Sequence, residues 1–172
     1  MNRPGGETLY FAYGANVHPG WLRRRIPAAT LLGAGLLPGY RLAFCKRGRD
    51  GAARSDACPS EAPGAALPGA LYLVNEPDLQ LLGAAGAGYR MAQIRVESAE
   101  GPVQAVTWIA EPAEVADGLL PWDWYVALIR AGAALLELPA AHRRWLETVP
   151  TAADPDAARA ALAHAVIAKL TR

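Results

Sequence analysis

The segment YFAYGAN, from Tyr10 to Asn16, stands near the start of a chain of 172 residues. Residues 8–13 are rich in aromatic side chains and stop at Gly14, a pattern typical of a strand that enters a tight turn. A strand that ends in an aromatic residue, glycine, a small residue and asparagine can bend sharply, which leaves consecutive backbone N–H groups unpaired and directed into one cavity. Because such amides bind carboxylates and carbonyl oxygens, the sequence predicts an acyl-binding turn at residues 14–16.

The segment after this turn predicts a short helix, two strands and a loop. Residues 18–26 have apolar side chains at helical spacing and a proline near the first turn. Residues 29–37 and 40–46 predict two strands that form a hairpin, because the dipeptide Pro38-Gly39 between them turns the chain. From 47 to 68 the composition shifts to Gly, Pro, Ser, Ala and mixed charges, which predicts a long mobile loop.

The middle of the chain predicts further strands. Residues 69–74 are predicted to form an apolar strand, and residues 77–84 a short helix that begins with proline and aspartate. Residues 89–97 and 103–110 alternate apolar and polar side chains with period two, which predicts a second hairpin. The turn of this hairpin is expected near Gly101.

The last third of the chain predicts helices. Apolar residues recur at helical spacing over 121–136 and again over 140–149. The final helix is expected over 154–170, with Asp154 as its cap and one stripe of apolar side chains. Strands first and helices last indicate an α+β fold, and we expect one domain over residues 1–172.

Charge and composition exclude several classes of protein. Hydrophobic residues make up 52% of the chain and charged residues 19%, a balance that argues against intrinsic disorder. The net charge of +1 gives no general field for nucleic acid or anionic lipid, so neither is expected as a partner. The longest apolar run, 26–37, is broken by proline and glycine and is shorter than the ~20 residues of a spanning helix. We therefore predict no membrane segment and, without a signal-peptide core, a cytoplasmic chain.

Side chains that often carry chemistry are sparse. The two cysteines, Cys45 and Cys58, have no CxxC spacing, so we expect small apolar residues rather than a disulfide framework or a zinc cluster. The segment GAAGAG at residues 83–88 follows a predicted helix instead of a strand, which argues against a dinucleotide-binding fingerprint. The basic residues that precede and enter the predicted loop either form a solvated surface or capture a carboxylate through the donor fork of arginine. These basic residues are Lys46, Arg47, Arg49 and Arg54.

The chain resembles the γ-glutamylcyclotransferase-like family, also called AIG2-like, whose hallmark is an N-terminal strand reading YFAYGSN or YFAYGAN. The resemblance spans roughly residues 8–147 and implies a small mixed β-barrel with surrounding helices and a pocket at the YGxN turn. Beyond YFAYGAN it rests on the order of shorter motifs. These are LPGYRL at 37–42, PGALY at 68–72, Tyr89-Arg90, Tyr125, Gly132-Ala133, Leu138-Pro139 and Trp145-Leu146.

The resemblance also implies a reaction and a binding site. Enzymes of this family make the α-amine of a γ-glutamyl amide attack its own γ-carbonyl, which releases an amine and leaves 5-oxoproline. Ring closure is intramolecular, so the protein folds the substrate, removes a proton and supports the oxyanion, and neither a metal nor another cofactor is expected. The expected partner is a small carboxylate or a γ-glutamyl compound. The residues implied to bind it are Tyr13, Gly14, Ala15, Asn16, Tyr89 and Tyr125.

The family places its proton-accepting glutamate in a pattern like LDxxEG, where this chain reads LLGAAG at residues 81–86. Ala85 stands in the place of the glutamate, and a positioned base contributes about 10² to 10⁴ in rate. Three alternatives follow. In the first, another carboxylate replaces the base, and Asp56 and Glu61 in the predicted loop are the expected candidates. In the second, the pocket serves a different chemistry on an amide or amine. In the third, the chain binds a small molecule without catalysis.

Overall fold

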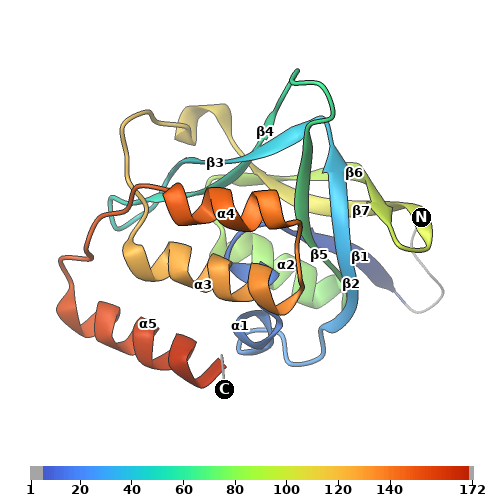
Figure 1. Ribbon diagram of the computed structural model, residues 1–172. Helices are drawn as coiled ribbons and strands as arrows, with labels where there is room; N and C mark the ends of the chain where they lie inside the picture. The colour runs from blue at the N-terminus through green and yellow to red at the C-terminus, as the bar shows by residue number, and fades with distance from the viewer. Residues whose placement is uncertain (1–5, 171–172) are drawn as a thin grey trace.

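The structure is a computed structural model that describes residues 6–170, apart from the side chain of Ala85. A closed barrel forms its centre, with the strands in the order β1, β5, β2, β6 and β7 (Figure 1). Neighbouring strands are antiparallel except where β7 meets β1, since Tyr10 pairs in parallel with Val106. The barrel strands are β1 (Glu7–Ala12), β2 (Thr30–Pro38), β5 (Ala66–Asn75), β6 (Tyr89–Ser98) and β7 (Gly101–Ala110).

A separate two-stranded sheet lies beside the barrel. It consists of β3 (Tyr40–Arg47) and β4 (Ala53–Pro59), which pair with each other. The predicted hairpin between residues 29–37 and 40–46 is therefore wrong, because β2 pairs with β5 and β6 instead. Gly39, between β2 and β3, has a φ of +75°, a left-handed conformation that glycine adopts freely. This bend sends β3 out of the barrel.

The prediction of a long loop over residues 47–68 is also wrong, because β4 and the start of β5 lie within it. β4 reads ARSDACP, and its buried positions include Ala53, Ser55 and Asp56. Such a strand lacks the large apolar residues that mark strands in a sequence. The second predicted hairpin is confirmed, since β6 and β7 pair along their whole length and turn beside Gly101.

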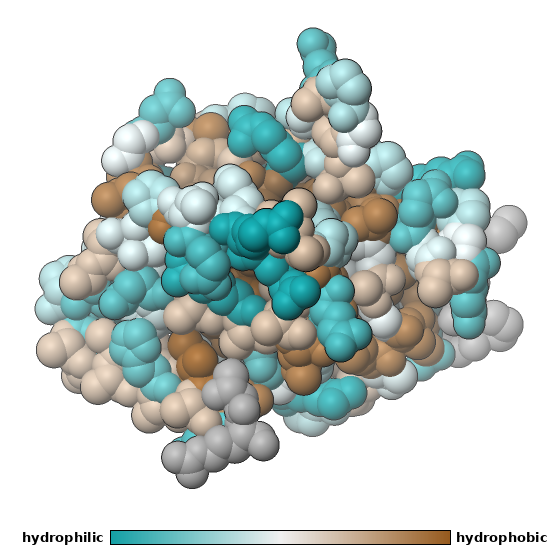
Figure 2. All heavy atoms as spheres, viewed as in Figure 1, coloured by the Kyte–Doolittle hydropathy of each residue, from teal (hydrophilic) through white to brown (hydrophobic). Residues whose placement is uncertain are grey.

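Helices surround the barrel and confirm the predicted α+β class. In Figure 1, α4, α3 and α5 follow one another from top to bottom, to the left of the barrel strands. Figure 2 shows hydrophilic side chains gathered over α4, which buries Leu146 alone. Within residues 6–170, no helix has both the length and the apolar character that crossing a bilayer requires. The helices are η1 (Ala15–Val17), α1 (Pro19–Arg23), α2 (Glu76–Ala85), η2 (Pro112–Glu114), α3 (Asp123–Leu135), α4 (Ala140–Thr148) and α5 (Ala157–Leu170).

Polar contacts hold α5 against α3. Asp154, predicted as the cap of the last helix, instead accepts a hydrogen bond of 2.8 Å from the indole of Trp124 and pairs with Arg159. The cap is Asp156, whose side chain accepts from the amide of Arg159 at 2.9 Å. Hydrogen bonding to Arg159 lowers the pKa of Asp154 well below its usual range. The carboxylate of Asp154 therefore stays charged and anchors the C-terminal helix.

The turn after β1 is packed against α3 through a glycine. A Cβ at Gly132 would lie 2.7 Å from the backbone nitrogen of His18 and 2.7 Å from Cγ1 of Val17. Real Cβ atoms do not approach backbone this closely, so the helix reaches the turn only because position 132 has no side chain. The position of α3, and of Tyr125 upon it, depends on this contact.

Replacing Gly132 by valine is expected to lower the free energy of unfolding by about 1–3 kcal/mol, the usual cost of overpacking a tight contact. The matched control is Ala134→Val on the exposed side of the same helix, which should stay within about 0.5 kcal/mol of wild type. Urea unfolding measures both. Equal stability of the two variants would contradict the dependence of α3 on this contact.

His18 joins the turn to α1. Its Nδ1 accepts a hydrogen bond of 3.1 Å from the amide of Gly20, and its side chain is buried. Burial lowers the pKa of His18 below its ordinary value. The neutral imidazole is the form that caps α1, because a protonated Nδ1 has no lone pair to accept with.

This shift predicts a pH dependence of stability. The unfolded chain takes up a proton near pH 6.5, before the folded chain does, so the contribution of His18 is complete above about pH 6.5 and is lost as the pH falls. Between pH 7 and 5, His18→Asn should lose less stability than wild type, because asparagine caps without titrating. Parallel slopes for wild type and His18→Asn would contradict the prediction.

Candidate functional site

A pocket of about 360 Å³ opens between the end of the barrel, the β3–β4 hairpin and α3. The structure brings to it all six residues that the resemblance implies, namely Tyr13, Gly14, Ala15, Asn16, Tyr89 and Tyr125. Their role in binding a substrate stays a prediction. The other lining residues that bear on the chemistry are Tyr10, Arg25, Lys46, Arg49, Arg54, Ser55, Thr107, Trp108 and Trp124.

The chain turns after β1 through the short helix η1. The carbonyl groups of Gly14 and Ala15 accept from the amides of Val17 and His18, at 2.9 and 3.2 Å, and form the short helix η1. The amides of residues 14–16 have no acceptor within the described part of the chain. Consecutive unpaired amides are donors that anions and carbonyl oxygens can accept from, and the role of these three in binding stays a prediction.

Gly14 lies against two hydroxyl groups. A Cβ at this position would stand 2.1 Å from Oγ of Ser55 and 3.3 Å from the hydroxyl of Tyr125. The absence of a side chain therefore lets β4 and α3 meet the turn. Ser55 Oγ and the Tyr125 hydroxyl are 2.8 Å apart and share a hydrogen bond, so the hairpin and the helix are joined at the pocket.

The other tyrosine hydroxyls of the pocket also have protein partners. Tyr13 donates to the carbonyl of Trp108, and Tyr89 donates to the carbonyl of Ser55 at 2.6 Å. Tyr10 accepts from the amide group of Asn16 at 3.1 Å. Burial raises the pKa of Tyr13 and of Tyr89 well above the ordinary value, and that of Tyr10 to about 12. These hydroxyls are therefore protonated at neutral pH and fix the pocket walls.

Basic side chains give the pocket its charge. Lys46, Arg49 and Arg54 line it, as the carboxylate-capture hypothesis requires, whereas Arg47 is not among the lining residues. Arg25 also lines the pocket, although its place after the YGAN turn gave no signal in the sequence. Arg54 pairs with Asp50 at 2.6 Å and lies 5.1 Å from the centre of the Tyr125 ring.

Lys46 differs from the arginines because it is buried. Its Nζ donates to the carbonyl of Arg47 at 2.6 Å, lies 5.3 Å from the centre of the Tyr89 ring and is 3.8 Å from a carboxylate oxygen of Glu114. Burial lowers the pKa of Lys46, while Glu114 opposes the shift. Sequence reasoning treated Lys46 together with the neighbouring arginines as either solvated or carboxylate-binding, and it did not predict the burial of Lys46, because burial on a hairpin cannot be read from the charge pattern.

No carboxylate lines the pocket within the described residues. Asp56, one expected replacement for the missing base, is buried in β4 and accepts from the amide of Ala110 at 2.8 Å. Glu61, the other, is exposed in the turn between β4 and β5. Ala85 is the last residue of α2, and its side chain lies outside the described part of the structure. The described pocket lining thus provides hydrogen-bond donors and positively charged side chains.

Comparison with solved structures finds other proteins with the same architecture. A structure described as gamma-glutamyl cyclotransferase superposes with a TM-score of 0.81 and 21% identity, over 95% of this chain and 99% of its own. The chain has the γ-glutamylcyclotransferase-like fold. An uncharacterised human protein superposes with a TM-score of 0.75 and 21% identity, over 86% of this chain and 90% of its own. YkqA from Bacillus subtilis gives 0.68 and 22%, over 85% of this chain and 56% of its own.

At these identities the likeness establishes the fold and leaves the activity open. No protein-family model matches the sequence, and no curated protein does so at a significant level. The resemblance inferred from YFAYGAN is confirmed at the level of the γ-glutamylcyclotransferase-like fold. Within this fold, the YGAN turn, the β3–β4 hairpin and α3 together bound the pocket described above.

The bond between Ser55 and Tyr125 predicts a measurable contribution to stability. Tyr125→Phe removes the hydroxyl that shares a hydrogen bond with Ser55 Oγ and accepts from the Ser55 amide at 3.3 Å. We expect a loss of about 1–3 kcal/mol, because buried groups of Ser55 lose their partner. Tyr40→Phe, a half-buried tyrosine outside the pocket, should cost less than about 0.5 kcal/mol. Thermal unfolding of both variants tests this, and an unchanged Tyr125→Phe would contradict it.

Proposed function

We propose that the protein binds a small carboxylate compound of the γ-glutamyl type in this pocket without the proton transfer of a cyclotransferase. The observation that carries the proposal is the make-up of the described pocket wall. It presents four basic side chains and three unpaired amides, and no carboxylate. Such a wall favours anionic groups, among them the carboxylates of a γ-glutamyl compound.

The positions of the donors suggest which part of the compound each would meet. The amides of residues 14–16 suit an acyl or carboxylate oxygen at the end of the barrel. Arg25 and Arg49 have no ion pair within the described residues and remain free to pair with a carboxylate. Arg54 is partly neutralised by Asp50, so it contributes less charge.

The absence of an acidic side chain bears on catalysis. A cyclotransferase must remove a proton from the α-ammonium of its substrate before the amine attacks the γ-carbonyl. The hydroxyls of Tyr13 and Tyr89 do not serve as bases at neutral pH, because burial raises their pKa. Neither Asp56 nor Glu61 is among the residues that line the pocket. These features support binding over turnover.

A second candidate is cyclotransferase activity in which Lys46 accepts the proton. It is favoured by one observation, the buried amine of Lys46 at the pocket wall with a pKa lowered by burial. A neutral amine near the substrate ammonium can act as a general base. Glu114, 3.8 Å away, favours the charged form and weakens this candidate.

Binding is tested by calorimetry with γ-glutamyl amino acids and with glutarate, against a neutral diamide of similar size. We expect the carboxylates to bind and the diamide not to bind. Arg49→Gln should weaken binding about tenfold or more, the value of a charge-assisted hydrogen bond. Arg90→Gln, an exposed arginine outside the pocket, is the matched control and should bind like wild type. Equal affinity for the neutral diamide would contradict the proposal.

Activity is tested by measuring 5-oxoproline release from a panel of γ-glutamyl compounds. Wild type should release no more than buffer, whereas Ala85→Glu, which restores the carboxylate at the place implied by the resemblance, should gain turnover. Release by wild type that is lost in Lys46→Met would support the second candidate and overturn the first.

A further inference from the structure

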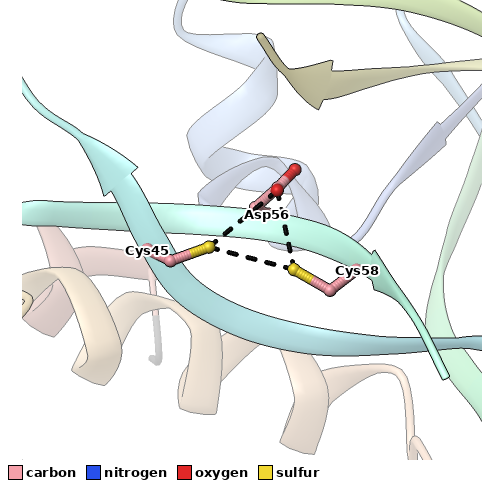
Figure 3. Close-up of side chains that lie close together, drawn as sticks. All are labelled: Cys45, Asp56 and Cys58. Atoms are coloured by element: carbon pink, nitrogen blue, oxygen red, sulfur yellow. Dashed lines mark hydrogen bonds between the residues drawn. The ribbon is translucent and has the colours of Figure 1, made fainter. Parts of the chain in front are cut away.

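A second cluster of reactive side chains lies on the β3–β4 hairpin, apart from the pocket lining. Cys45 comes from β3, and Asp56 and Cys58 come from β4. Figure 3 shows the two sulfur atoms and the carboxylate pointing toward one another. The two sulfurs are 3.8 Å apart, and Oδ2 of Asp56 is 3.6 Å from Cys58 Sγ and 3.9 Å from Cys45 Sγ.

These separations match the edges of a tetrahedral metal site. Zinc binds thiolate sulfur at about 2.3 Å and carboxylate oxygen at about 2.0–2.2 Å, so neighbouring ligand atoms around it stand about 3.5–3.8 Å apart. The three measured separations agree with this spacing to within a few tenths of an ångström. A cation can therefore reach all three atoms without a rearrangement of the hairpin and keep a fourth position open.

The carboxylate supplies an independent reason for a cation. Asp56 is 4% exposed, and its Oδ1 accepts a single hydrogen bond, from the amide of Ala110 at 2.8 Å. No basic side chain lies within 4.0 Å of it among residues 6–170. Its Oδ2 faces only the two sulfurs, which are weak donors. Burying a carboxylate without a countercharge is costly, and a divalent cation removes that cost.

The strand register argues against a disulfide. A disulfide needs sulfurs about 2.05 Å apart and Cα atoms usually within about 6.8 Å, a spacing that directly opposed residues provide. Cys58 is opposed to Arg41, whereas Cys45 sits at the irregularity between Phe44 and Lys46, which face Ser55 and Arg54. The two cysteines are thus offset along the hairpin. Their side chains nevertheless bring the two sulfurs to 3.8 Å from each other beside Asp56 (Figure 3).

We propose that Cys45, Asp56 and Cys58 form a binding site for a thiophilic divalent cation, with Zn²⁺ as the probe. Two thiolates and one carboxylate are a donor set that suits zinc better than magnesium or calcium. Binding displaces the two thiol protons to solvent and leaves the fourth position to water. This inference does not rest on the proposed function.

A cation bound at this site would hold the two strands of the hairpin together. Cys45 directly precedes Lys46, and Asp56 directly follows Ser55, so the ligands neighbour two residues of the pocket. An isolated two-stranded hairpin is marginally stable, and Asp56 also ties this one to β7 through Ala110. A bound cation would therefore fix β3 and β4 against the barrel and raise the melting temperature.

The test uses the full chain, purified under reductant and stripped with a chelator. Zn²⁺ is titrated in competition with a chromogenic chelator, and Co²⁺ is added to detect the thiolate-to-metal charge-transfer band. We expect one equivalent of metal, a charge-transfer band and a raised melting temperature. Cys45→Ser and Asp56→Asn should each weaken binding more than about 100-fold, since loss of a ligand exceeds the usual effect of an outer-shell change. His164→Ala is the control, because His164 and Asp123 form an exposed pair 3.8 Å apart, and should bind like wild type.

The wild-type readouts decide the outcome even if a variant fails to fold, which thermal unfolding without metal reveals. Protection of both thiols from a thiol reagent by one equivalent of Zn²⁺ would support the site. Absence of the charge-transfer band in reduced wild type would overturn it, as would unchanged affinity in folded Cys45→Ser. Recovery of the chain with its two sulfurs bonded, even when purified under reductant, would also overturn it.

Discussion

The pocket depends on one steric constraint, the close approach of three segments at a position without a side chain. Gly14 follows the first strand, and a Cβ at this position would stand 2.1 Å from Oγ of Ser55 and 3.3 Å from the Tyr125 hydroxyl. This approach brings the hairpin and α3 to the same wall, beside a turn in which the amides of residues 14–16 are unpaired within the described chain. Gly132 has a similar steric role, because its lack of a side chain lets α3 contact the backbone of His18.

The chemistry of the pocket follows from what the hairpin contributes. β3 and β4 lie outside the barrel and place Lys46, Arg54 and Ser55 at the turn. The hydroxyls of the buried tyrosines form hydrogen bonds with backbone carbonyls and with Ser55. The tyrosine hydroxyls in the pocket wall are therefore held in place and protonated, and the basic side chains give the wall a positive charge. A pocket of this kind suits an acyl group and a carboxylate, as proposed above, and within residues 6–170 no carboxylate lines it to accept a proton. The account of binding without turnover rests on that combination.

Sequence reasoning could reach β6 and β7, the YGAN turn and the C-terminal helices, because each leaves a local signal. The barrel was implied only by the resemblance to the γ-glutamylcyclotransferase-like family. Alternation marked β6 and β7, and the glycine and asparagine marked the turn. It failed for β4, since a strand whose buried positions are alanine, serine and aspartate has no apolar signal. It also missed the meeting of Cys45 with Asp56 and Cys58, and the approach of Arg25 to the pocket, because both depend on contacts between distant elements.

The most direct test of the central claim is to follow the backbone amides of Gly14, Ala15 and Asn16 by nuclear magnetic resonance while glutarate is added to the full chain. The account predicts that these three signals move together and saturate with one site, because the carboxylate takes up donors that the fold leaves unpaired. Signals that stay in place while other residues respond, or that respond without saturating, would contradict it.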